Sequence, residues 1–272
     1  AQGSSDLGEP FYSDDAAQHH LVDEGWIWML RFNNAITSVG FVANEQFIAS
    51  HDPAKLWAQI RSRYPTIDAL LSGSELVAPR QNGFVQWGNL RRSSRLWAQA
   101  AGSNWFMLPG TVGVIDPLHS TGIAHALSGV RRIARTLLGK TSADMNYADD
   151  VPEELKWIDQ IVAIAYQAKA INFQLFTAAC TLYFVAAIHC ERNMAVAGQM
   201  PEGFLCWKNT ELRKLVGWFQ SRLHLIEKQT ATEGEQEQVL EQFRRKLEPW
   251  NDVGLLDPSL HNRIARSSAP KA

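Results

Sequence analysis

Little in this sequence of 272 residues marks it as disulfide-bonded, membrane-spanning or strongly charged. Its three cysteines, Cys180, Cys190 and Cys206, show no C-x-x-C spacing, which favours a reducing, cytoplasmic location. The longest apolar run, from Leu175 to His189, is shorter than the roughly 20 residues that span a bilayer, which indicates a buried helix. A net charge of −2 gives no sign of a nucleic-acid or membrane partner. We therefore expect an ordinary globular cytoplasmic protein.

The chain also lacks a first methionine and a secretory signal. It starts at Ala1 with AQGSSDLGEPFYSDD, a stretch rich in glycine, serine and acidic residues that is typical of a linker or a cut end. Residues 1–22 are accordingly interpreted as a lead-in.

Strand patterns dominate residues 23–118, which we expect to form an antiparallel sheet region. The stretch GWIWMLRFNNAITSVGFV predicts a β-hairpin, because its apolar residues alternate and Asn33-Asn34 tolerates the positive φ of a two-residue turn. Further strands are expected in GFVQWGNLRR, residues 83–92, and around a turn at Gly102-Ser103. A helix with an Asp cap interrupts this region from Asp52 to Pro65, and a shorter one follows it.

Helical patterns fill residues 119–272. Apolar residues recur at three-to-four spacing after Gly122 and predict a helix that Gly139 stops. A tract from Pro152 to about Arg192 is apolar nearly all round, so it is expected to be buried. The predicted fold class is therefore α+β, with an antiparallel sheet followed by a helical C-terminal region. The apolar stripe of the first helix consists of Ile123, Leu127, Val130, Ala134 and Leu137.

The turn in front of this first helix, VIDPLHSTG, combines several specialised residues. Pro117 fixes φ, and Ser120 or Thr121 can cap the helix. Gly122 lets the backbone approach a ligand closely. The first turn of a helix presents unpaired N–H groups and about half a positive charge, which suits an anion. The alternative is an ordinary Ser/Thr cap on a buried helix.

Two motifs, in this order and at this separation, resemble flavin-dependent halogenases, the tryptophan-halogenase-like branch of the flavin monooxygenase fold. The W-I-W run that begins at Trp26 is similar to part of their W-x-W-x-I-P motif on a strand. The D-P-L-H-S-T-G run from Asp116 to Gly122 is similar to the turn that opens a helix beside their isoalloxazine ring. The resemblance covers essentially the whole chain. It implies FAD, a partner flavin reductase, oxygen and, for halogenation, chloride, with an aromatic or electron-rich small molecule as substrate.

The resemblance also implies cofactor-binding residues. In the similar enzymes, the amides around the Thr-Gly step bind chloride next to the flavin. Carried over to this chain, the backbone amides of Thr121 and Gly122 would take that role. Pro117 and Ser120 would lie beside the same flavin edge.

Catalytic and substrate roles follow in the same way. His119 stands where tryptophan halogenases carry Glu, which makes an indole substrate less expected. Because histidine titrates near neutral pH, His119 is predicted to be a catalytic proton shuttle or a hydrogen-bond partner of the substrate, the alternative being a structural histidine. Trp26 and Trp28 would wall the substrate cavity, and the alternative is that both belong to the core of the sheet.

Other polar residues are interpreted structurally. Asp116 is expected to orient the turn through backbone amides, and His125 to pack against a neighbouring helix. His19 and His20 have no third ligand at a suitable spacing, so no metal site is predicted. The residues interpreted as a solvated basic patch are Arg131, Arg132 and Arg135.

Departures from the family motifs are equally informative. The chain has no G-x-G-x-x-G run, whose glycines let the backbone approach the FAD pyrophosphate in the family. The resemblance therefore implies a C-terminal portion only, which lacks the N-terminal Rossmann-type FAD-binding half and the catalytic lysine in it. We expect the isolated chain to bind FAD weakly or not at all and to be inactive. Leu30-Arg31 replaces Ile-Pro, and Pro109-Gly110 replaces a Gly-Asp pair.

Two alternatives to a halogenase stay open on the sequence. One is a flavin monooxygenase or dehydrogenase of the same fold without halide chemistry. The other is a non-catalytic binding or scaffold module that has lost its flavin half.

Overall fold

The computed structural model describes residues 16–44, 46–47, 52–75, 77, 95–140, 146–198, 200, 202–229 and 231–256. Helices and small antiparallel sheets occur together, as the α+β class requires. The chain divides into two compact units, namely Ala1–Arg91 with Ala265–Ala272, and Arg92–Ile264. The three segments expected from the sequence, which meet after residues 22 and 118, stay a prediction.

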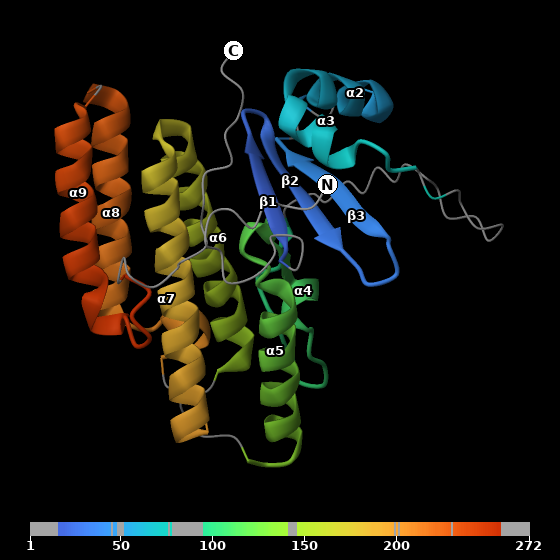
Figure 1. Ribbon diagram of the computed structural model, residues 1–272. Coiled ribbons are helices and arrows are strands. Elements are labelled where there is room, and N and C mark those ends of the chain that lie inside the picture. The colour runs from blue at the N-terminus through green and yellow to red at the C-terminus, as the bar shows by residue number, and fades with distance from the viewer. Residues whose placement is uncertain are drawn as a thin grey trace. The chain divides into compact units, whose positions relative to one another are not determined.

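The first unit contains a three-stranded antiparallel sheet in the order β1-β2-β3 (Figure 1). Strand β1 lies within the residues interpreted as a lead-in, and the hairpin that follows it was predicted. Both expected helices follow the sheet. The elements are β1 (Gln18–Val22), β2 (Gly25–Arg31), β3 (Thr37–Ala43), α2 (Pro53–Arg63) and α3 (Pro65–Leu71).

The core of this unit forms between one face of the sheet and the two helices. Ile27 and Met29 of β2 are buried in it together with Leu56 and Ile60 of α2. Asp52 Oδ1 accepts a hydrogen bond from the Lys55 amide at 3.1 Å, which confirms the predicted cap of α2.

The predicted two-residue turn of the hairpin is wrong. β2 ends at Arg31 and β3 begins at Thr37, so a longer loop joins them. The loop closes with a hydrogen bond of 2.9 Å from the Phe32 amide to the Ile36 carbonyl. The positive φ of 63° falls on Ala35, because the Asn34 side chain accepts from the Ile36 amide and turns the chain after it.

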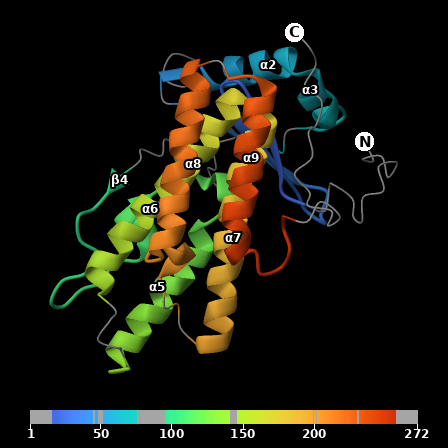
Figure 2. The ribbon, with the colours of Figure 1, turned by 90° about the vertical axis from the view of Figure 1, so that its left-hand side faces the viewer.

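The second unit is mainly helical. Contacts join α6 to α7 and α8, and α9 to α7 and α8, so four long helices pack side by side (Figures 1 and 2). The strands expected at residues 83–92 lie outside the described residues, whereas a turn at Gly102-Ser103 is confirmed by a bond from the Gly102 amide to the Trp105 carbonyl. The elements are β4 (Arg95–Leu96), α4 (Pro109–Val112), β5 (Gly113–Val114), η3 (Pro117–His119), α5 (Gly122–Leu137), α6 (Tyr147–Ile171), α7 (Phe173–Ala197), η4 (Phe204–Cys206), α8 (Thr210–Gln229), α9 (Glu233–Leu247) and η5 (Glu248–Trp250).

The single buried tract predicted from Pro152 to Arg192 is in fact two helices. The chain leaves the helical conformation at Asn172, where φ is −163°. Asn172 Oδ1 accepts a hydrogen bond of 2.8 Å from the Leu175 amide and so caps the N-terminus of α7. The prediction failed because the pattern of apolar residues gives no sign that the Asn172 side chain bonds a backbone amide and so ends the helical run.

Helix α7 bears on the expectation that no segment crosses a membrane. Phe173–Val196 is long and apolar enough to do so by length and composition alone, since the helix continues beyond the apolar run seen in the sequence. However, 56% of its apolar window is buried inside the fold, and core helices pass the same test. The absence of a membrane partner stays a prediction.

Helix α5 turns its apolar stripe outwards. A stripe of this kind normally faces the core, yet Ile123 is 78% exposed and Leu137 is 73% exposed. The buried face carries His125 and Arg132 instead. The stripe exposed on α5 comprises Ile123, Leu127, Val130 and Leu137.

Candidate functional site

Asp116 holds the turn before α5 in place through two hydrogen bonds. Its Oδ1 accepts a hydrogen bond from the Leu118 amide at 2.9 Å, which confirms the expectation that this carboxylate orients the turn. Its Oδ2 accepts from the Tyr166 hydroxyl on α6, also at 2.9 Å. The front of α5 is therefore attached to the helix bundle through Asp116.

Neither hydroxyl of the turn caps the helix. Ser120 has the left-handed φ of 54°, and its side chain is exposed. Thr121 is buried and helical, and its Oγ1 donates to the Tyr183 hydroxyl of α7 at 3.0 Å. The predicted cap is wrong because the one buried hydroxyl bonds a neighbouring helix instead of the amides of α5.

His119 is packed between the turn and α7. Its ring is buried, with its centroid 4.3 Å from that of Tyr183 and 6.4 Å from that of Phe184. Burial raises the pKa of Tyr183, against the opposing effect of the Thr121 hydrogen bond, so this phenol stays neutral at physiological pH. The structure fixes the position of the His119 ring. Its role in proton transfer stays a prediction.

The front end of α5 is open around Gly122. A Cβ atom added to Gly122 would meet no other atom within 4 Å. Ser120 and Ile123 are exposed beside it. Because the first amides of a helix have no intrahelical acceptor, this end can receive an anion or the electron-rich edge of a planar ligand.

A buried ionic cluster explains the polar inner face of α5. Glu154 of α6 is 1% exposed and accepts two hydrogen bonds from Arg132, at 2.9 and 2.7 Å. It also accepts one from His125 Nε2 at 2.9 Å and one from the Phe204 amide at 3.3 Å. The interpretation of Arg132 as a solvated residue is wrong, since it is buried in this cluster.

Electrostatics keep Glu154 ionised in the interior. Burial acts to raise its pKa, but the hydrogen bond from His125 and the charge of Arg132 outweigh burial and lower it. The sequence carried a signal for this cluster that our interpretation missed. His125, Ser128, Gly129 and Arg132 share one helical face at three-to-four spacing.

The predicted substrate residues lie together on β2 in the first unit. Trp26 is 2% exposed, and its ring centroid is 4.8 Å from that of His19 and 6.1 Å from that of Trp28. A Cβ atom added to Gly40 would lie 1.8 Å from the Trp28 ring, so only glycine fits opposite it. Burial of Trp26 agrees with a core position. That either residue lines a substrate cavity stays a prediction.

The first unit also carries an open groove of about 600 Å³. Its lining comes from α2, Glu24 and Phe47, and none of the predicted site residues belongs to it. The groove therefore gives no support to the predicted site residues.

Comparison with known proteins gives several matches, although no family model matches the chain. It is 23% identical over 175 residues to tetracycline 7-halogenase from Kitasatospora aureofaciens, and 30% identical over 168 residues to the flavin-dependent halogenase otaD from Aspergillus carbonarius. It is 24% identical over 162 residues to the halogenase PrnC from Pseudomonas fluorescens. Over these segments the chain is similar in sequence to flavin-dependent halogenases.

The matches cover only part of each protein. The first two alignments take 58% of this chain and 30% of each relative, and the third takes 57% and 27%. The crystal structure of halogenase PltM superposes with a TM-score of 0.69 at 18% identity, over 96% of this chain and 56% of PltM. A complex of PltM with phloroglucinol and FAD superposes with a TM-score of 0.68. The halogenase relationship thus rests on sequence, and the shared fold on structure.

Proposed function

We propose that this chain is part of a flavin-dependent, halogenase-like oxidoreductase that acts on an aromatic or electron-rich small molecule. The sequence similarity to three halogenases carries the proposal. The D-P-L-H-S-T-G turn supports it, because its open helix end suits a halide or a flavin edge.

Reduced FAD, when bound, would supply with oxygen the two-electron oxidation that turns halide into an electrophilic halogen. The amides of Thr121 and Gly122 would bind the anion at the front of α5, where the partial positive charge of the helix favours it. Ser120 is exposed at the same edge, and Pro117 restricts the turn before it. His119 holds or moves a proton from its fixed position against Tyr183.

In the same proposal, the exposed apolar stripe on α5 is an interaction surface for the FAD-binding half. The matches cover about 30% of the length of these curated relatives, and the enzyme that we propose includes a FAD-binding half. Apolar faces of this kind mark interaction surfaces. The stripe packs against the FAD-binding half, and a separate flavin reductase in the cytoplasm supplies the reduced flavin.

The test uses the full-length protein encoded at this locus. It is incubated with FAD, a flavin reductase, NADH, oxygen and phloroglucinol, the ligand of the PltM complex, over a series of chloride and bromide concentrations. We expect a product with a halogen isotope pattern in mass spectrometry that requires both reductase and halide. An oxygenated product formed equally without halide would instead assign a monooxygenase, and no product would refute the proposal.

A further inference from the structure

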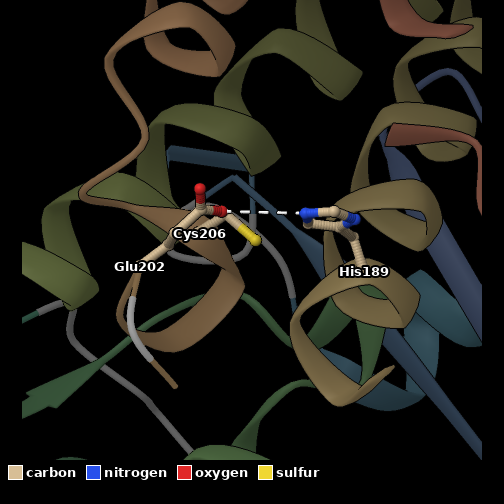
Figure 3. A group of neighbouring side chains, drawn as sticks. All are labelled: His189, Glu202 and Cys206. Carbon is tan, nitrogen blue, oxygen red and sulfur yellow. Dashed lines mark ion pairs between the residues drawn. The ribbon is translucent and has the colours of Figure 1, made fainter. Parts of the chain in front are cut away.

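Three side chains of different ligand types meet in the second unit, away from the turn. His189 lies on α7, Glu202 lies between α7 and η4, and Cys206 ends η4. One donor atom from each lies within 4.8 Å of the other two. Figure 3 shows the imidazole and the carboxylate facing one another, with the sulfur of Cys206 beside them.

Glu202 supplies an unsatisfied atom to this cluster. Its Oε1 accepts a hydrogen bond of 2.8 Å from Asn209, but its buried Oε2 accepts none from any described residue. Oε2 lies 3.8 Å from His189 Nε2. That distance is too long for a hydrogen bond. It is close to the separation of about 3.3 Å between two ligand atoms on one tetrahedral zinc ion.

His189 is oriented from behind by a second carboxylate. Its Nδ1 lies 2.7 Å from Asp252 Oδ2, a normal hydrogen bond. When Nδ1 donates this bond, Nε2 keeps its lone pair and directs it at Glu202 and Cys206. A carboxylate behind a metal-binding histidine is the usual arrangement in zinc sites, where it fixes the tautomer and raises the basicity of the ligand.

Cys206 provides a buried sulfur at the bottom of the cluster. It has no exposed surface, and both it and Leu205 adopt left-handed φ values, of 57° and 52°. Such backbone is costly for residues other than glycine and tends to persist where it positions a functional group. The side chains of His189 and Glu202 are 19% and 32% exposed, so an ion can enter from their side.

We propose that His189, Glu202 and Cys206 bind a zinc ion. Nitrogen, sulfur and carboxylate oxygen are the donors that zinc selects, and water completes a tetrahedral set. Binding deprotonates the thiol, so Zn²⁺ and Cys206-SH give the zinc thiolate and one released proton. The metal joins α7 to the segment before α8 and so stabilises this part of the second unit. The prediction of no metal site considered only His19 and His20.

The experiment titrates Co²⁺, a spectroscopic substitute for zinc, into the metal-free 272-residue chain under reducing conditions. We expect one equivalent to bind, with the sulfur-to-cobalt charge-transfer band and visible bands of a tetrahedral thiolate site, and Zn²⁺ to displace it. Cys206→Ser should abolish the charge-transfer band. Asp252→Asn should retain it and lower the affinity about 10–100-fold, because only the support of His189 is lost.

Cys180→Ser is the matched control, since Cys180 is a buried cysteine of α7 outside the cluster. It should bind Co²⁺ like the unmodified chain. Glu202→Gln, at a partly exposed position, weakens binding without loss of the fold, which circular dichroism verifies. A chain that shows no charge-transfer band refutes the site. A band that survives Cys206→Ser, or that Cys180→Ser removes, also refutes it.

Discussion

Gly122 is not needed for its backbone conformation. The left-handed residue of the turn is Ser120, with φ of 54°, and Gly122 begins α5 as an ordinary helical residue. Its lack of a side chain matters only for what approaches from outside, because a Cβ atom there would meet nothing within 4 Å. Gly122→Val therefore probes ligand access separately from folding.

We expect Gly122→Val in the full-length enzyme to lower halogenation at least about tenfold, because the β-branched side chain crowds the first amides of α5. Stability should change by less than about 1 kcal/mol and should not fall for lack of helix propensity, since valine has a higher helix propensity than glycine. Gly234→Val is the matched control, since Gly234 lies in the first turn of α9 with equally open space. Equal turnover of both variants over the chloride series would show that the turn is structural.

Glu154, in contrast to Gly122, matters for folding, because its buried carboxylate balances the charge of Arg132. Glu154→Gln should lower the free energy of unfolding by about 3–5 kcal/mol, because it leaves Arg132 buried without a counter-charge. Glu153→Gln should change it by less than about 0.5 kcal/mol, because that side chain is 40% exposed and forms a surface ion pair with Lys156. Urea denaturation of the three proteins measures both differences.

The same pair of proteins gives a pH prediction. The folded pKa of Glu154 is lowered below its usual value of 4.5, so the stabilisation is complete above that pH and is lost as pH falls through the folded pKa. The difference in unfolding free energy between the unmodified chain and Glu154→Gln should stay constant from neutral pH to about 5 and shrink below 4.5. A difference that grows on acidification would contradict the assignment of Glu154 as ionised.

At the scale of elements, α5 shows that a buried charge can place the polar face of a helix inwards and its apolar face outwards. Its apolar stripe looks like a core face, but the ionic partners of His125 and Arg132 lie on α6 and turn the polar side inwards. The stripe is left at the surface of this chain. An exposed apolar stripe promotes association.

We expect the isolated chain to self-associate through this helix. Leu127→Gln combined with Leu137→Gln should reduce the association seen by light scattering and change stability by less than about 1 kcal/mol, because both side chains are largely exposed. Val196→Gln is the control, since Val196 is 90% exposed on α7. A strictly monomeric chain at high concentration, or equal effects of both variants, would argue against an interaction face on α5.

At the scale of the whole molecule, this chain supplies only part of what its relatives carry. PltM matches it over 56% of the PltM chain, and the curated relatives over about 30% of theirs. The proposed division of labour places FAD binding mainly outside these residues, because the chain has no G-x-G-x-x-G run.

We therefore expect the isolated chain to purify colourless and to bind FAD no better than weakly. Equilibrium dialysis should give a dissociation constant well above the micromolar range. A sub-micromolar value would reveal an adenine-nucleotide site that the sequence motifs do not announce.

The sequence by itself predicted the similarity to flavin-dependent halogenases and the α+β class, and it singled out the turn before α5. Short-range rules sufficed there, since the W-I-W run, the alternation in the hairpin and the D-P-L-H-S-T-G run are local patterns. Asp116 was placed correctly because its partner, the Leu118 amide, is two residues away.

Only the tertiary structure decided which faces are buried and which polar groups meet. Glu154 reaches Arg132 across 22 residues of sequence and Phe204 across 50. The spacing of His125 and Arg132 marks one polar face of α5, but it does not identify the distant carboxylate that draws this face inwards. Asn172 splits one apolar tract because its side chain takes a backbone amide, a choice that hydrophobic periodicity does not encode. Tertiary structure also brings together the donor atoms of His189, Glu202 and Cys206. The backbone at Leu205 and Cys206 is left-handed, and the Cys206 sulfur faces α7, where it donates to the Ala186 carbonyl.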